Sequence, residues 1–117
     1  MRHLYAVFAW GIVALGVVHM SATGRVHSST TAALWFFSGG VSMVLTGAIN
    51  LLNRSYGAAA PGLRRVCIAT SAGMTVFAFV LGVASHASVP QLVTVVGWFA
   101  VTTILSSIRA ARAVLPA

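Results

Sequence analysis

Four long apolar segments constrain the fold of this chain more than any other feature. They lie at residues 4–20, 32–52, 66–87 and 91–108 of the 117-residue sequence, and none contains a formally charged side chain. A helix of about 20 apolar residues spans the hydrocarbon core of a bilayer. Strands of a membrane barrel are only about 10 residues long and alternate in polarity. The segments therefore predict transmembrane helices, whose backbone groups are all paired internally.

The composition predicts that these helices form one integral membrane domain over residues 1–117. Charged residues make up 6% of the chain, whereas soluble proteins contain about 25%. The first segment follows Arg2 and also resembles a signal peptide. We favour a retained helix, because Met20 is a poor residue at position −3 of a cleavage site after Ala22. The expected fold is all-α, a four-transmembrane-helix bundle.

The links between the segments predict how the helices begin and how they are connected. Residues 21–31 are rich in Ser and Thr, whose hydroxyls can cap the second helix. In the last link, Ser88 is suited to be an N-cap and Pro90 to be the first helical residue. A link this short makes the third and fourth helices antiparallel neighbours. We therefore expect an up-down-up-down bundle.

The arginines predict the orientation in the membrane. With four spans, only Arg25 lies on one side, and the other six lie on the opposite side: Arg2, Arg54, Arg64, Arg65, Arg109 and Arg112. The positive-inside rule then places both termini in the cytoplasm. Because the arginines flank apolar segments, their expected partners are anionic lipid headgroups and not nucleic acid. The headgroups are expected near Arg54, Arg64, Arg65, Arg109 and Arg112.

The chain contains no Asp and no Glu. It therefore has no side-chain carboxylate to act as a general acid, a nucleophile, a proton relay or a ligand for Ca²⁺ or Mg²⁺. The single cysteine, Cys67, cannot form an internal disulfide and is expected to be a small buried residue. No Ser–His–acid triad can exist. These absences predict a protein that is not an enzyme.

A polar stripe runs along the segment at residues 32–52. Its members recur every four residues: Ser38, Ser42, Thr46 and Asn50. Small residues beside them let helix backbones approach, and hydroxyls can bond to a neighbouring helix or to the preceding turn. We expect a helix–helix interface, with a polar cavity for a lipid headgroup, quinone or small solute as the alternative. The amide of Asn50 requires partners, either on a neighbouring helix or on a ligand.

His19 and His86 form a second candidate constellation. Both are expected near the outer end of a helix, and they lie within similar sequences, LGVVHMS and LGVASHAS. Two histidines on facing helices can ligate haem iron or copper. The alternative is a pair of amphipathic side chains at headgroup level. We predict no cofactor, and keep haem or copper at these two residues as the alternative.

Aromatic residues near the expected interfaces are typical of a membrane belt. They are Tyr5, Trp35, Phe36, Phe37 and Tyr56. Trp10 and Trp98 lie nearer the middle of their segments. Since an indole N–H there requires an acceptor, we expect both rings to face the interior of the bundle.

Residues 33–54, ALWFFSGGVSMVLTGAINLLNR, resemble a pattern in small, uncharacterised bacterial membrane proteins of four helices. In that pattern an ALWF run leads into a Gly-rich span that ends in Asn-Leu, here Asn50 and Leu51, and the first segment ends in G-x-x-H, here Gly16 to His19. The architecture is also similar to that of DoxX-like proteins. The resemblance implies a four-helix fold and a bacterial inner membrane, and it implies no activity.

The expected function is that of a non-enzymatic membrane component: a subunit of a larger complex, a homo-oligomer or a lipid-binding bundle. One alternative is a haem- or metal-binding redox protein that uses His19 and His86. Another is a small-solute or lipid transporter that works without carboxylates, with the polar stripe lining its path.

Overall fold

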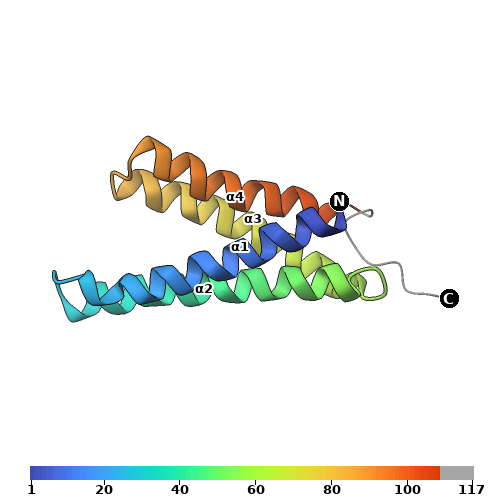
Figure 1. The fold of residues 1–117 in the computed structure, drawn as a ribbon, viewed down its shortest axis with the longest axis horizontal. Helices are drawn as coiled ribbons and strands as arrows, with labels where there is room; N and C mark the ends of the chain where they lie inside the picture. The colour runs from blue at the N-terminus through green and yellow to red at the C-terminus, as the bar shows by residue number, and fades with distance from the viewer. Residues whose placement is uncertain (109–117) are drawn as a thin grey trace.

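The computed structural model describes residues 1–108, so Arg109 and Arg112 lie outside the described part of the chain. The described part is all-helical (Figure 1). Its elements are α1 (Arg2–Ser21), the short 3₁₀ helix η1 (Ala22–Arg25), α2 (Thr30–Tyr56), α3 (Pro61–Ala84) and α4 (Val89–Ser107). The prediction of four helices long and apolar enough to cross a membrane is confirmed.

Two helix starts follow from local side-chain chemistry, as predicted. The hydroxyl of Ser29 accepts a hydrogen bond of 3.0 Å from the backbone N–H of Ala32 and caps α2. Ser88 and Gln91 form a reciprocal capping box at the start of α4. That helix already begins at Val89, so Pro90 is its second residue and not its first.

Helix α2 continues past residue 52, where the sequence places its end, and stops at Tyr56. The extra turn brings Asn53 into the helix, and its side chain is fully buried. Gly57 ends the helix, and its N–H donates to the carbonyl of Asn53 at 2.8 Å. A Cβ at Gly57 would collide with the side chain of Asn53, which explains a glycine at this position. Helix α3 likewise begins at Pro61, earlier than residue 66.

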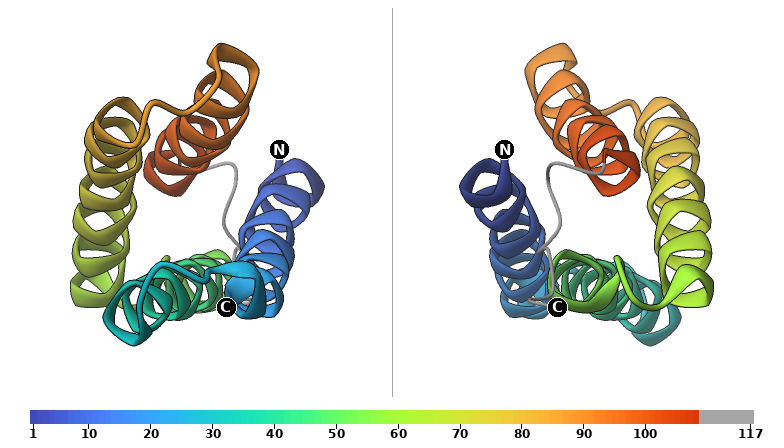
Figure 2. Two further views of the ribbon diagram at one scale, coloured as in Figure 1. Left: turned by 90° about the vertical axis from the view of Figure 1, so that its left-hand side faces the viewer. Right: turned by 90° about the vertical axis from the view of Figure 1, so that its right-hand side faces the viewer.

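The four helices form two hairpins, α1 with α2 and α3 with α4 (Figures 1 and 2). Glycines bring the backbones of the first hairpin into close contact. A Cβ on Gly16 would lie 2.7 Å from the carbonyl oxygen of Gly40, and one on Gly40 would lie 2.8 Å from that of Gly16. Further along, a Cβ on Gly47 would lie 2.8 Å from the carbonyl oxygen of Ala9. The glycines of α2 therefore set the spacing of this hairpin.

The two hairpins approach each other at one end of the molecule and separate towards the other (Figure 1). Midway, Trp98 of α4 donates its indole N–H to the carbonyl of Phe8 at 2.9 Å and packs against the Phe8 ring. The expectation that Trp98 faces the interior is confirmed. The same expectation for Trp10 is wrong, since its side chain is 61% exposed. Trp10 directly follows Ala9 of the buried face, and one residue turns a helix by about 100° onto the outer face.

The distribution of side chains between interior and surface differs from that in a soluble protein, where buried side chains are mostly apolar. Half of the side chains buried in the described residues are polar: Thr46, Asn50, Asn53, Ser71, Thr102 and Ser106. Large apolar side chains such as Leu45, Val80 and Ile104 point outwards. A surface of this kind is stable in hydrocarbon, where polar groups must find partners inside the bundle.

Candidate functional site

The end at which the hairpins meet contains a buried polar network that joins all four helices. We call it the arginine end, because it holds Arg2, Arg54 and Arg64 at the ends of α1, α2 and α3. The hydroxyl of Tyr5 donates to Oδ1 of Asn50 at 2.8 Å and accepts from Nδ2 of Asn53 at 2.9 Å. The amide of Asn53 also donates to the carbonyl of Ser106 on α4 at 3.2 Å.

Asn50 connects this network to α3. Its Nδ2 donates to the hydroxyl of Ser71 at 2.8 Å and to the carbonyl of Thr46 on its own helix. The thiol of Cys67 donates to Oδ1 of Asn50 at 3.3 Å. The partners required by the Asn50 amide are thus supplied by neighbouring helices. Cys67 is fully buried, as predicted.

The placement of Tyr5 in the aromatic belt is wrong, because the whole side chain is buried at the centre of the network. Position along the sequence places Tyr5 near an interface, but the direction of its ring depends on the rotation of α1 about its axis. Sequence reasoning also missed Asn53 and Ser71. A signal was available for Asn53, which follows Asn50 by three residues and therefore lies on the same helix face.

The polar stripe of α2 is divided between surface and interior. Ser38 is exposed and donates to the carbonyl of Trp35, while Ser42 donates to that of Ser38. Thr46 is buried and donates to the carbonyl of Ser42. Only Asn50 bonds to side chains of other helices. None of these four residues lines either of the cavities described next.

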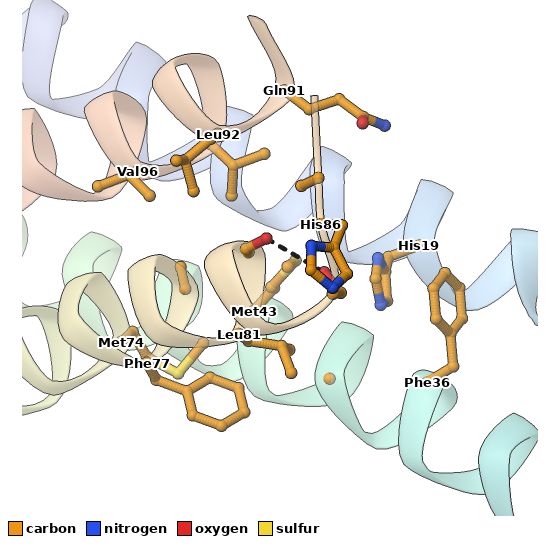
Figure 3. Close-up of a pocket in the computed structure, with 16 residues that line it drawn as sticks. His19, Phe36, Met43, Met74, Phe77, Leu81, His86, Gln91, Leu92 and Val96 are labelled. Atoms are coloured by element: carbon orange, nitrogen blue, oxygen red, sulfur yellow. Dashed lines mark hydrogen bonds between the residues drawn. The ribbon is translucent and has the colours of Figure 1, made fainter. Parts of the chain in front are cut away.

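At the opposite end, where the hairpins separate, a cavity of about 470 Å³ lies between them (Figure 3). We call this the histidine end, because His19 of α1 and His86, just beyond α3, both line the cavity. A smaller cavity of about 190 Å³ shares His19, Phe36 and Met43 with it. The sequence-predicted histidine pair is therefore brought to one site by the fold.

Most of the cavity wall is apolar and comes from both hairpins. Phe36, Met43, Met74, Phe77, Leu81, Leu92 and Val96 lie around it (Figure 3). Its volume falls in the range of small-molecule sites, about 300–1,000 Å³. Phe77 and Leu81 are each 52% exposed. The cavity therefore opens onto the apolar outer surface beside α3.

The two histidines are held in different ways. The ring of His19 stacks on Phe36, with 3.7 Å between centroids and 17° between planes. Phe36, placed in the belt by the sequence, thus forms part of the cavity wall. His86 follows α3 with a φ of 54°, the only positive φ of a non-glycine residue in residues 1–108. This left-handed conformation is costly for a residue with a Cβ, and such strain gathers at functional sites.

Metal ligation at this end has few candidate donors. Within the described residues, no group of three or more His, Cys, Asp or Glu side chains could hold a metal ion. Cys67 belongs to the network at the arginine end. A metal would therefore depend on the two histidines with the thioethers of Met43 and Met74, a soft donor set of the kind that binds Cu(I).

Comparisons of the chain with protein-family models, with curated proteins and with solved structures find no match. The class of protein is therefore defined by the fold alone. Four helices that can each cross a membrane, with polar side chains inside and apolar ones outside, indicate a multi-pass membrane protein. The resemblance of residues 33–54 to small bacterial membrane proteins stays a prediction.

Proposed function

We propose that this chain is a non-enzymatic lipid-binding protein that holds a lipid-soluble molecule between its two hairpins at the histidine end. The observation that carries the proposal is the cavity of about 470 Å³, with an apolar wall and His19 and His86 at its rim. Because the cavity opens beside half-exposed Phe77 and Leu81, a ligand can enter sideways from the lipid.

The proposal includes a location and an orientation. The membrane is the bacterial inner membrane, crossed up-down-up-down, with both termini in the cytoplasm. Arg2, Arg54 and Arg64 gather at one end of the described bundle and Arg25 lies at the other, which supports this orientation by the positive-inside rule. The side chain of Arg54 donates to the carbonyl of Arg2 at 2.9 Å, and its remaining N–H groups can contact anionic headgroups.

Filling the cavity tests the proposal. Ala78 lines the cavity, so Ala78→Phe places a ring in the space that the ligand would occupy. Ala69 is an exposed residue of the same helix and does not line the cavity, which makes Ala69→Phe the matched control. We expect native mass spectrometry in mild detergent to show retained lipid in the unmodified protein and in Ala69→Phe, and a loss in Ala78→Phe.

The same spectra give the number of copies, which tests whether the chain works as a homo-oligomer or as a subunit of a larger complex. A clean monomer with no retained lipid or partner would contradict the proposal in all its forms.

A second candidate function is haem or copper binding. It is favoured by the specific observation that His19 and His86 line one cavity together with Met43 and Met74. Absorption spectra and metal analysis of protein purified from iron- and copper-replete cells test it. A haem band or bound copper that disappears in His19→Ala would support it, and colourless, metal-free protein would exclude it.

A further inference from the structure

The polar rim of the cavity contains hydrogen-bonding side chains, and none of them is an acid or an arginine. Its polar residues within the described chain are His19, Ser85, His86 and Gln91. The hydroxyl of Ser85 donates to the carbonyl of Gly82, and Oε1 of Gln91 accepts from Ser88 in the capping box. The groups left to face a ligand are the amide nitrogen of Gln91 and the two imidazoles, each of which has one N–H donor and one acceptor nitrogen when it is neutral.

This rim disfavours charged headgroups. A phosphate is normally bound by Arg or Lys, and no arginine in residues 1–108 lines the cavity. An ammonium group requires a carboxylate or an aromatic cage, and the chain contains no Asp or Glu at all. A ligand whose polar part is a neutral acceptor, such as a carbonyl oxygen, matches the donors that are present.

The shape of the site adds a preference for a flat ring. The stacked rings of His19 and Phe36 form a planar wall on the first hairpin. Phe77 and His86 stand on the second hairpin across the cavity (Figure 3). Aromatic faces favour offset or tilted contact with another planar ring. Donors on both hairpins are suited to a ring that carries acceptors on opposite edges.

We propose that the ligand is a lipoquinone-type molecule, a neutral ring with two carbonyl groups and an isoprenoid or alkyl tail. The ring lies between His19 and His86, which donate hydrogen bonds to its two carbonyl oxygens, and the tail leaves past Phe77 and Leu81 into the lipid. This inference rests on the proposed lipid-binding function and specifies the chemical class of the ligand. It concerns binding only and involves no electron transfer.

Three ligands that share an alkyl tail test the proposal: a decyl-substituted benzoquinone, decylbenzene and decyl phosphate. Each is added to protein in phosphatidylcholine nanodiscs, and bound ligand is measured by mass spectrometry after removal of the excess. We expect the quinone to bind about a hundredfold more tightly than decylbenzene, because each of the two hydrogen bonds in a desolvated pocket provides about a tenfold gain. Decyl phosphate is expected to bind no better than decylbenzene.

Histidine variants then identify the donors. His19→Phe keeps an aromatic ring for stacking on Phe36 but removes the N–H donor. His86→Gly removes the imidazole at a position whose positive φ suits glycine. Each is expected to weaken quinone binding about tenfold and to leave decylbenzene binding unchanged. His86→Asn tolerates the same φ and keeps an N–H donor, so it is expected to retain part of the affinity.

His27→Gly is the matched control, because His27 is an exposed loop residue that does not line the cavity. It is expected to bind the quinone as the unmodified protein does. Equal binding of quinone and decylbenzene, unaffected by the histidine variants, would overturn the quinone proposal and leave lipid binding intact. Failure of all three ligands to bind would instead overturn the proposed function itself.

Discussion

The two ends of the bundle use their polar residues in opposite ways. At the arginine end, Tyr5, Asn50 and Asn53 are fully buried and bond to one another and to neighbouring helices. At the histidine end, His19 and His86 border a cavity, and the surrounding wall is apolar. The hydrogen bonds between buried polar groups hold the helices together at the arginine end, where Oδ1 of Asn53 alone among these three residues has no partner within residues 1–108. At the histidine end, polar groups that face a cavity are available to a ligand. We therefore expect the first end to contribute mainly to stability, and we propose ligand binding at the second.

The largest change in the free energy of unfolding is expected from Asn50→Leu. This change removes the acceptor of Tyr5 and Cys67 and the donor to Ser71. Interhelical hydrogen bonds in membranes contribute about 0.6 kcal/mol each, and unsatisfied buried partners cost about 1–3 kcal/mol. We expect the free energy of unfolding in mixed detergent micelles to fall by about 3 kcal/mol.

The control is Ser38→Ala, which removes an exposed hydroxyl bonded to its own helix. It is expected to change the same quantity by less than about 0.5 kcal/mol. An equal fall in the free energy of unfolding in the two variants would mean that the buried network at the arginine end does not stabilise the protein more than an exposed hydroxyl does.

Thiol labelling compares how often the two ends open. The thiol of Cys67 is fully buried, whereas Ser85 at the histidine end is exposed. We expect a soluble maleimide to label Ser85→Cys, in a Cys67→Ala background, roughly a hundredfold faster than Cys67, since labelling of Cys67 must await local opening. Similar rates at both positions would show that the network opens as readily as the cavity rim.

Replacing glycines by alanine tests the close contact between α1 and α2 in the first hairpin. Gly16→Ala places a Cβ within 2.7 Å of the carbonyl oxygen of Gly40, and we expect a loss of about 1–3 kcal/mol in the free energy of unfolding. Gly73 faces open space, so Gly73→Ala is expected to be neutral or to stabilise by up to about 1 kcal/mol. Thermal unfolding in detergent measures both. A stable Gly16→Ala variant would contradict the close packing of α1 and α2.

The smallest change in the free energy of unfolding is expected at the histidine end. His86→Gly relieves a positive φ, and we expect it to raise the free energy of unfolding by up to about 1 kcal/mol. His27→Gly should lower it by a similar amount, because glycine there only adds freedom to the unfolded chain. Opposite signs in chemical denaturation would support strain at His86, and a loss in both variants would argue against it.

Particular residues show which structural features of this chain can be predicted from its sequence and which cannot. The sequence predicts Ser88 as a cap and places the cap of α2 among the Ser and Thr of residues 21–31, because capping depends on neighbours a few residues away. The sequence predicts that the amide of Asn50 needs partners, but it places Tyr5, one of those partners, in the aromatic belt at the membrane interface. The two are separated by 45 positions in the chain. The histidine pair was suggested by similar flanking sequences, while the cavity between them could not be foreseen.

The sequence by itself determined that the chain forms four helices long and apolar enough to cross a membrane, because hydrocarbon requires long apolar segments with internally paired backbones. It also determined that this chain has no side-chain carboxylate to contribute to a function. Only the tertiary structure decided which polar residues are enclosed and which face a cavity. That outcome depends on the rotation of each helix and on the angle between the hairpins, both of which result from contacts between residues far apart in the chain.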